Sequence, residues 1–327
     1  MNRKVIFILV VVLSVFLIFS CSEQSKKGQN NKLLPVKNIN LISLEVLTDT
    51  AEGRFYHPQF SEDGQRIFFT SLNYKGIWYY SFPSRIVTQL SDANGIGYRF
   101  AVGNSGKKIY YRLKVRSGYK RKVNYSIAEQ DVGSKKITIL VSSKGRISPP
   151  VITDKNTLLY SKKGEIHLID LNTKAEKSGD ESTNLILSLD NKLVKIKSGK
   201  VIKSNNSNSA NILYGSKSPA NDDIAFVVKG QGLFIKNSNG NTNHIKDGLQ
   251  PAWSPDGRML AFVKEKSDGM KITESKIFIA VLPSLKEFNL LADKNILASD
   301  PAWSPDGKKL VFNSDEGEII LASLNIQ

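Results

Sequence analysis

Cysteine is nearly absent from this 327-residue chain, which has one Cys, three His and three Met. A single thiol cannot form an internal disulfide or a cysteine-rich zinc site. The histidines, His57, His167 and His244, lie far apart in the sequence and show no metal-binding spacing such as His-x-x-x-His. No Gly-x-Ser-x-Gly segment is present, which excludes the nucleophile elbow of an α/β-hydrolase. We therefore predict no metal and no cofactor.

Acidic residues are also in the minority. Lys and Arg number 46 against 30 Asp and Glu, so the formal net charge is +16. Such an excess favours acidic partners. Alanine is scarce, whereas Ile, Val, Leu, Tyr and Phe recur in short alternating runs. This pattern predicts a mostly β protein, and the hydrophobic content of 40% is enough for a packed core.

Only one long apolar run occurs, at residues 5–19, directly after Arg3 and Lys4. A membrane-spanning helix needs about 20 apolar residues, so the run fits the apolar region of a secretory signal better. We predict a signal peptide at residues 1–20, and the alternative is an uncleaved signal anchor with an incidental cysteine. Since export removes the chain from the cytoplasm, nucleic acid is not expected as a partner despite the charge.

The sole cysteine ends this signal. Residues 18–21, Ile-Phe-Ser-Cys, resemble the lipobox of bacterial lipoproteins, although the bulky Phe19 is unusual there. The resemblance implies cleavage before Cys21 and lipid attachment to its sulfur, which anchors the chain to a membrane on its periplasmic side. Ser22 after the cysteine favours the outer membrane over the inner one. Residues 21–38, rich in Ser, Gln, Asn and Lys, are then the lipidated Cys and a flexible tether.

A repeat defines the rest of the chain. Residues 251–257 (Pro-Ala-Trp-Ser-Pro-Asp-Gly) recur at 301–307, and a third copy, Pro-Gln-Phe-Ser-Glu-Asp-Gly, occupies 58–64. Each copy precedes a basic residue and an apolar strand. Aspartate bonds to nearby backbone and glycine adopts a left-handed conformation, so the motif predicts a tight turn between two strands. We assign structural roles in these turns to Asp63, Gly64, Asp256, Gly257, Asp306 and Gly307.

Four weaker copies end at residues 106, 156, 191 and 223, so that the turns follow one another at intervals of roughly 32–50 residues, which is typical of β-propellers. We predict an all-β propeller at residues 39–327 with seven four-stranded blades. Six blades are the alternative, because the copies at 191 and 223 are weak. The last blade lacks a fourth strand of its own, and residues 39–47 form a strand without a blade. Pairing residues 39–47 with 318–324 would close the propeller.

The three strong copies resemble the WD40-like PD40 repeat of the TolB-like propellers of bacterial envelope proteins. The resemblance covers residues from about 40 to 327 and implies a toroidal propeller whose funnel or rim binds a partner. Residues 22–40 are too short for the α/β domain that precedes the propeller in TolB. The particular role of TolB is therefore not transferred to this chain.

One segment departs from the repeat. Residues 107–125 extend the second copy into a long basic hairpin interleaved with tyrosines. Cationic and aromatic side chains together suit an acidic polymer, a lipid headgroup or an acidic protein. The candidate partner-binding residues are Arg112, Lys114, Arg116, Tyr119, Lys120, Arg121 and Lys122. The alternative is a solvated hairpin without a binding role.

The sequence thus predicts a non-enzymatic binding or scaffolding lipoprotein of the bacterial envelope. Its partner is an envelope protein, an acidic glycan or a lipid headgroup. The alternative is a carbohydrate-active or hydrolytic propeller enzyme with its site in the central funnel. Such an enzyme needs unrepeated acids or histidines at the ends of the innermost strands, and the sequence alone singles out no such set.

Overall fold

The computed structural model describes residues 35–117, 122–154, 156–163, 165–179, 185–189, 192–197, 200–202 and 212–327. Within it, Val36–Gln327 form one compact unit. The predicted signal peptide and Cys21, most of the tether, and Tyr119, Lys120 and Arg121 lie outside the described residues, as does the side chain of Lys122. In the part that is described, no helix is long and apolar enough to cross a membrane.

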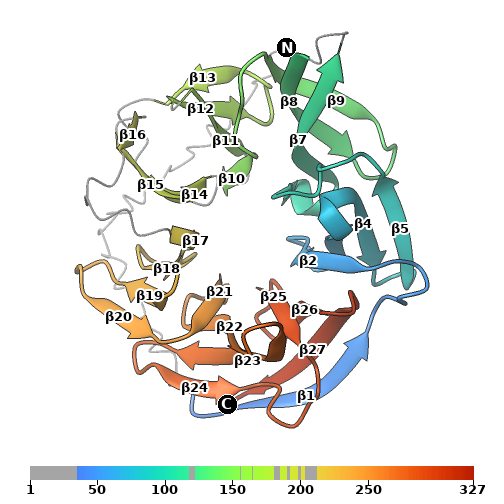
Figure 1. The fold of residues 1–327 in the computed structure, drawn as a ribbon. Coiled ribbons are helices and arrows are strands. Elements are labelled where there is room, and N and C mark those ends of the chain that lie inside the picture. Colours follow the sequence, from blue (N-terminus) through green and yellow to red (C-terminus); the bar gives the residue numbers. More distant parts are fainter. Residues whose placement is uncertain are drawn as a thin grey trace, which may run out of the picture. The chain divides into compact units, whose positions relative to one another are not determined.

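The described residues form a β-propeller of antiparallel sheets (Figure 1). Six blades have four strands each, ordered from the innermost to the outermost strand. Blade 1 contains β2 (Phe55–Phe60), β3 (Arg66–Ser71), β4 (Lys75–Ser81) and β5 (Ile86–Ser91). Blade 2 contains β6 (Ala101–Gly103), β7 (Lys108–Ser117), β8 (Lys122–Asp131) and β9 (Ile137–Ser143). Blade 3 contains β10 (Val151–Asp154), β11 (Thr157–Lys162), β12 (Glu165–Asp170) and β13 (Glu176–Ser178).

The later blades follow the same order. Blade 4 contains β17 (Ile212–Lys217), β18 (Ile224–Val228), β19 (Gly232–Lys236) and β20 (Thr242–Ile245). Blade 5 contains β21 (Gly248–Trp253), β22 (Met259–Ser267), β23 (Ile272–Val281) and β24 (Lys286–Asn289). Blade 6 contains β25 (Ala298–Trp303), β26 (Lys309–Ser314), β27 (Ile319–Ile326) and β1 (Ile39–Val46). Two short 3₁₀ turns complete the described elements, η1 (Leu72–Tyr74) and η2 (Asn104–Gly106).

Three further strands lie between blades 3 and 4, namely β14 (Leu185–Leu189), β15 (Lys192–Lys197) and β16 (Lys200–Ile202). They form an antiparallel meander that joins blade 3 through one pair, Glu165 with Lys200. The four-stranded blades therefore number six, the alternative of the two predicted counts. The predicted repeat whose turn ends at residue 191 corresponds to these three strands, with the turn itself outside the described residues.

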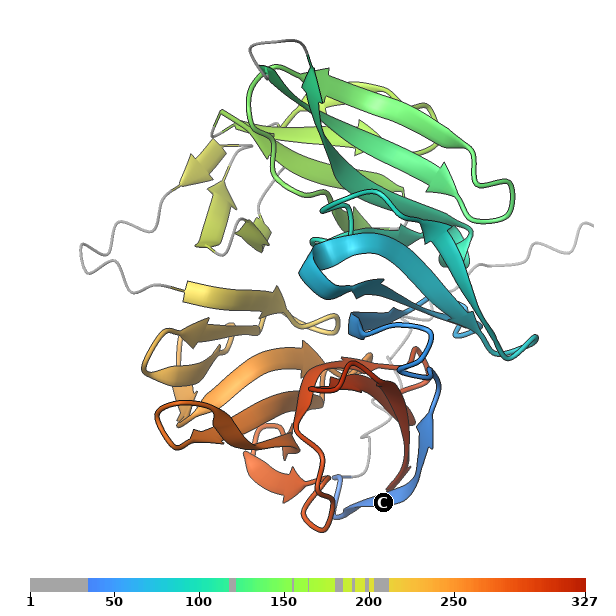
Figure 2. The same cartoon turned by 45° about the vertical axis from the view of Figure 1, so that its right-hand side comes forward.

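The predicted closure is confirmed. β1 pairs antiparallel with β27, from Ile39 opposite Ile326 to Val46 opposite Ile320, and so supplies the outermost strand of blade 6 (Figures 1 and 2). The N–H of Ile319 also donates to Thr48 Oγ1 at 2.9 Å, just after β1 ends. An N-terminal strand thereby completes the blade built from the C-terminal one and covers an edge that would otherwise be unpaired.

Each strong repeat forms a tight turn between the first two strands of its blade. In blade 5, Ser254 Oγ donates to Asp256 Oδ1 at 2.7 Å and accepts from the N–H of Met259 at 2.9 Å. Gly257 has a φ of +67°, and a Cβ there would lie 2.6 Å from Ser218 Oγ in blade 4. Glycine is therefore required both by the backbone conformation and by the packing of neighbouring blades. The same serine–aspartate bonds recur in blades 1 and 6.

The tryptophans of the repeat connect neighbouring blades. Trp303 Nε1 donates to the carbonyl of Ala252 at 3.1 Å, and Trp253 Nε1 donates to the carbonyl of Ser216 at 3.2 Å. Between the blades, buried apolar side chains from adjacent sheets pack together, as Phe68 of blade 1 does with Tyr111 of blade 2. Most of the core therefore lies between sheets, so that each blade depends on its neighbours.

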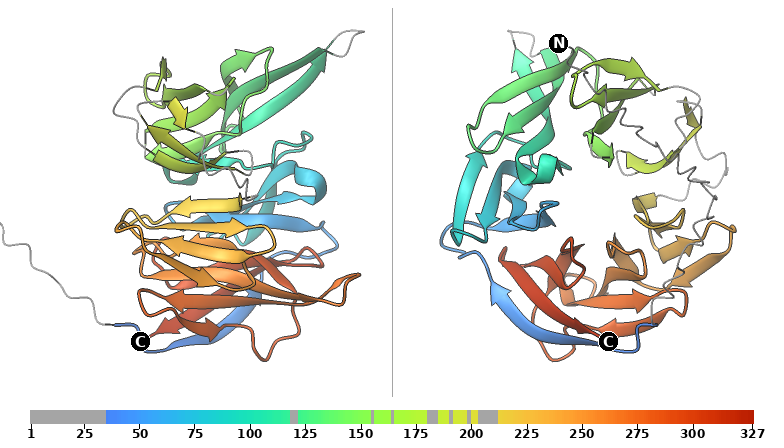
Figure 3. Two further views of the ribbon diagram at one scale, coloured as in Figure 1. Left: turned by 60° about the vertical axis from the view of Figure 1, so that its left-hand side comes forward. Right: turned by 180° about the vertical axis from the view of Figure 1, so that it is seen from behind.

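The two ends of the blades differ. We call the end that carries the Asp-Gly turns the turn end, and the opposite end, where each innermost strand begins, the bulge end. The register of β1 with β27 places Ile39 toward the turn end. Two long hairpins, β7–β8 and β22–β23, extend from the sheets at the bulge end, and Figure 3 shows them on the same side.

Closure by β1 gives the first test. Ile39 is 6% exposed and packs in the core, whereas Ile42 on the same strand is 65% exposed. Ile39→Thr should lower the free energy of unfolding by about 2–4 kcal/mol, because a hydroxyl replaces a buried ethyl group. Ile42→Thr, the matched control, should change it by less than about 0.5 kcal/mol. Urea unfolding followed by tryptophan fluorescence measures both, and equal midpoints for the two variants would contradict closure by β1.

Candidate functional site: a pocket at the bulge end

The innermost strands of several blades share an irregularity near their first residues. In β2, β21 and β25 the pairing register shifts just before the proline of the repeat. There His57, Gln250 and Asp300 adopt left-handed backbone conformations, with φ of 56°, 50° and 52°. Arg99 occupies the equivalent position of blade 2 and also has a left-handed conformation, with a φ of 53°. Left-handed residues other than glycine are uncommon, and these four occupy equivalent positions of four blades at the bulge end.

A pocket of about 330 Å³ lies among these residues. It is formed by blades 1, 2, 4 and 6, which are brought together by the propeller rather than by the sequence. The side chains that give it chemical character are His57, Tyr74, Tyr98, Arg99, Tyr214 and Asp300. Tyr214 occupies the equivalent position in blade 4, since it lies four residues before Ser218, as Gln250 lies four residues before Ser254. The pocket therefore draws on the same position in several repeats.

A short contact between an imidazole and a carboxylate joins the first and last blades at this pocket. His57 Nδ1 lies 2.8 Å from Asp300 Oδ2, and the side chains are 41% and 19% exposed. The N–H of His57 donates to Asn313 Oδ1 at 3.1 Å, and the N–H of Asp300 donates to Gln250 Oε1 at 2.9 Å. Both backbones are thus held by side chains from blades 5 and 6. The imidazole and the carboxylate are fixed relative to each other.

Aromatic rings form much of the remaining wall. Tyr74, from η1, stacks on the ring of His57 with centroids 5.1 Å apart, and meets the ring of Tyr98 edge-on at 5.0 Å. The guanidinium carbon of Arg99 lies 5.8 Å from the centroid of Tyr98. Such an arrangement offers flat apolar surfaces beside polar groups, a combination suited to holding a small polar ligand.

The charge of Asp300 extends across the pocket. Burial raises the pKa of Tyr74, with contributions from Tyr98 and Asp300, while Arg99 acts in the opposite direction. Burial and Asp300 also raise the pKa of Tyr214 and that of Glu265 on β22. Both tyrosine hydroxyls are consequently neutral at physiological pH and available as hydrogen-bond groups.

The predicted basic hairpin adjoins this pocket. Arg112, Lys114 and Arg116 alternate along β7 and therefore share one face, with Lys114 and Arg116 exposed. Arg112 is partly buried, donates through Nη1 to the carbonyl of Ile147 at 2.9 Å, and lies 5.8 Å from the ring centroid of Tyr98. Through Arg112, the hairpin therefore contacts Tyr98, which lines the pocket. The hairpin and the pocket both lie at the bulge end of the propeller, with Arg112 beside Tyr98.

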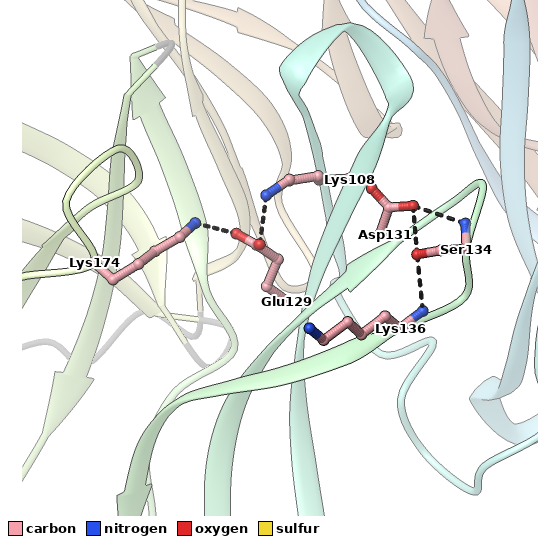
Figure 4. Close-up of polar contacts among 6 residues, drawn as sticks. All are labelled: Lys108, Glu129, Asp131, Ser134, Lys136 and Lys174. Carbon is pink, nitrogen blue, oxygen red and sulfur yellow. Dashed lines mark hydrogen bonds and ion pairs between the residues drawn. The ribbon is translucent and has the colours of Figure 1, made fainter.

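A second charged cluster lies between blades 2 and 3 (Figure 4). The Glu129 carboxylate, 8% exposed, accepts from Lys108 Nζ at 2.6 Å and from Lys174 of blade 3. Burial alone would raise the pKa of Glu129, but the hydrogen bonds and charges of the two lysines outweigh it and lower that pKa. Nearby, Asp131 caps the β8–β9 turn by accepting from the N–H and the hydroxyl of Ser134. These partners connect blades and close a turn, so the cluster is structural.

The two other histidines lie away from the pocket. His167 Nδ1 is 2.9 Å from Glu176 Oε1 and its ring stacks on Tyr160, both within blade 3. His244 stacks on Phe234 in blade 4. Among the described residues, no group of three or more His, Cys, Asp or Glu side chains is placed to hold a metal ion.

In the sequence, His57 shows no metal-binding spacing, and Asp300, Arg99 and Tyr74 are not singled out. A signal was present, however. The residue before each strong repeat differs from copy to copy, being His57, Gln250 and Asp300, whereas the proline after it is constant. A variable residue at a constant position in a repeat is not needed for the turn, so it is free to serve a site. What the sequence did not show is that two of these positions, His57 and Asp300, line one pocket.

No protein-family model and no curated protein matches the chain. Among solved structures, a chain of a mitotic checkpoint complex aligns over 99% of both chains, with a TM-score of 0.54 and 15% identity. TolB from Acinetobacter baumannii aligns with a TM-score of 0.43 and 16% identity, over 83% of this chain and 63% of TolB. An oligogalacturonate lyase from Vibrio parahaemolyticus aligns with a TM-score of 0.43 and 11% identity, over 85% and 79%. The alignment with TolB spans less than two thirds of that protein. At 15% identity, the likeness to the chain of the mitotic checkpoint complex concerns the fold alone.

The Glu129 cluster provides a pH-dependent test. A carboxylate whose pKa is lower in the folded than in the unfolded state stabilises the fold above the unfolded value, about 4.3, and this contribution is lost as the pH falls through the folded value. Glu129→Gln should therefore cost on the order of 1–3 kcal/mol at pH 7, and the difference from the wild type should shrink below about pH 4.

The control is Glu274→Gln, which breaks the exposed pair with Lys266 on the β22–β23 hairpin. It should change stability by less than about 1 kcal/mol at either pH. Urea unfolding at pH 7 and at about pH 3 measures both variants. A Glu129→Gln variant as stable as the control at pH 7 would show that the buried cluster does not join the blades.

Proposed function

We propose that this chain is a non-enzymatic binding lipoprotein of the bacterial envelope, which holds a protein or glycan partner at the bulge end of its propeller. The observation that carries the proposal is the pocket, where equivalent positions of the repeat bear unlike side chains. The repeat itself supplies only the backbone. Unlike side chains at equivalent positions around one pocket are what a recognition surface on a repetitive scaffold requires.

Two features of the surface around the pocket support a partner larger than the pocket. The exposed Lys114 and Arg116 extend the surface along β7, away from Arg112 at the pocket's rim. The β22–β23 hairpin extends at the same end (Figure 3). A partner seated on this end would contact the pocket at its centre and the basic hairpin at one side, with charge favouring an acidic outer surface on the partner.

The His57–Asp300 pair favours a second candidate function, a propeller enzyme that acts in the same pocket. A carboxylate that orients an imidazole is a common arrangement for a general base. The two candidates differ in the fate of the ligand. A binding protein releases it chemically unchanged, whereas an enzyme alters its mass, and mass spectrometry of ligand recovered from the purified chain separates the two.

The anchor is tested at the cysteine. Cys21→Ser should abolish incorporation of labelled palmitate and shift the chain from the membrane to the soluble fraction, because no thiol is left to carry lipid. Ser22→Ala, the control beside it, should retain both label and membrane association. A Cys21→Ser chain that still resists extraction from membranes with carbonate would instead support an uncleaved signal anchor.

The binding surface is tested by crosslinking in the native envelope followed by mass spectrometry. Lys114→Ser with Arg116→Ser should reduce capture of the partner at least about tenfold, since two favourable charge contacts are lost. The control is Lys236→Ser with Lys308→Ser, which removes two exposed cations at the turn end, away from the proposed surface.

A second variant, Asp300→Asn with Arg99→Gln, tests the pocket in the same experiment and should abolish capture. If both the hairpin and the pocket variants capture the same partners as the wild type, the bulge end is not the binding surface. Loss in the pocket variant alone would restrict the surface to the pocket and leave the hairpin as a solvated one.

A further inference from the structure

The pocket carries two opposite charges on different blades. Arg99, from blade 2, and Asp300, from blade 6, both line it, and both are placed by the left-handed step at the start of an innermost strand. They are separated in the sequence by most of the propeller. Both charges act on the hydroxyls of Tyr74 and Tyr214, because Asp300 raises the pKa of each hydroxyl and Arg99 lowers it. Both tyrosines thus line the pocket together with the two opposite charges.

We propose that this pocket binds a zwitterionic ligand of the amino acid or short peptide class, with its ammonium group at Asp300 and its carboxylate at Arg99. The inference rests on the proposed binding function and names the ligand of that same site.

The anionic wall suits an ammonium group. The Asp300 carboxylate is only 19% exposed, so a charge contact there is weakly screened by water. The rings of His57 and Tyr74 stack beside it, and the aromatic face of a tyrosine attracts cations. At Tyr74 and at Tyr214, the effect of Asp300 on the pKa exceeds the opposing effect of Arg99. At these two hydroxyls Asp300 is therefore the stronger of the two charges, and its Oδ2 also contacts His57 Nδ1 at 2.8 Å.

The cationic wall suits a carboxylate. A guanidinium presents a planar fork of donors that matches the two oxygens of a carboxylate. The Arg99 guanidinium lies against the Tyr98 ring at 5.8 Å, and Arg112 lies against the same ring at the same distance. Arg112, which also donates to the carbonyl of Ile147, adds a second cation near Tyr98. A cavity of about 330 Å³ has room for an amino acid or a dipeptide.

A ligand with a single charge fits less well. A pure anion that pairs with Arg99 is repelled by Asp300, and a pure cation at Asp300 is repelled by Arg99 and Arg112. A ligand with both groups satisfies both walls, and its apolar part can lie on the tyrosine rings between them. Complementarity to both signs also discriminates against the singly charged molecules.

Four related probes test the proposal by isothermal titration calorimetry on the folded chain. They share a phenyl ring and differ in charge: L-phenylalanine carries both groups, phenethylamine only the ammonium, 3-phenylpropanoate only the carboxylate, and 2-phenylethanol neither. L-phenylalanine should bind at least about tenfold more tightly than either singly charged probe, because each charged contact contributes roughly a factor of ten or more. The neutral alcohol should bind most weakly.

Two variants assign the charges. Asp300→Asn should weaken L-phenylalanine and phenethylamine about tenfold and leave 3-phenylpropanoate unaffected or improved. Arg99→Gln should do the reverse, weakening the two probes that carry a carboxylate. Both replacements suit the left-handed backbone, since Asn adopts it readily and Gln250 already occupies the equivalent step. Matched controls are Asp222→Asn and Arg85→Gln, which alter exposed pairs away from the pocket and should leave all four affinities unchanged.

Three results overturn the proposal: 2-phenylethanol or a singly charged probe binding as tightly as L-phenylalanine, variants at Asp300 and Arg99 that leave the affinities unchanged, or no probe binding at its highest soluble concentration. Any of these, combined with pocket-dependent capture of an envelope partner, overturns the ligand class and leaves the binding function standing. If the pocket variant also captures the partner as well as the wild type does in the crosslinking experiment, both the ligand class and the binding function at the pocket are overturned.

Discussion

Closure of the propeller by β1 is the constraint on which the rest of the structure depends. Pairing of β1 with β27 brings the beginning of the domain to its end and sets blade 1 beside blade 6. The contact between His57 and Asp300 crosses this junction, as does the bond from His57 to Asn313. Without closure, neither contact forms and the pocket loses one wall. β1, an outermost strand, is thus linked to two contacts between innermost strands, those of His57 with Asp300 and with Asn313.

The propeller separates stability from recognition along each blade. At the turn end of blades 1, 5 and 6 the repeat is strict, because each Ser-x-Asp-Gly turn bonds its own backbone and its glycine packs against a neighbour. At the bulge end the left-handed step is kept and the side chain varies, from His57 to Arg99, Gln250 and Asp300. Each left-handed residue costs of order 1 kcal/mol or more, which the cores between blades offset.

Charge is organised differently on the surface and in the interior. The chain carries a net charge of +16, yet the pocket holds a weakly solvated carboxylate whose influence reaches Tyr74, Tyr214 and Glu265. The buried Glu129 is neutralised by two lysines and serves to join blades. Overall charge therefore indicates the character of a partner's outer surface, while the group bound in the pocket is set by Asp300 and Arg99.

The sequence by itself determined the class of fold, the strong turns and the closing strand, because turn residues and alternating apolar runs act over a few neighbours and repeat. It left the blade count open, since the copies near residues 191 and 223 are degenerate, and the structure shows six four-stranded blades with three additional strands. The basic hairpin was visible as a local run of charge. Only the tertiary structure decided the pocket, because Asp300 and His57 meet through closure of the propeller, and no local pattern encodes a contact between the first blade and the last.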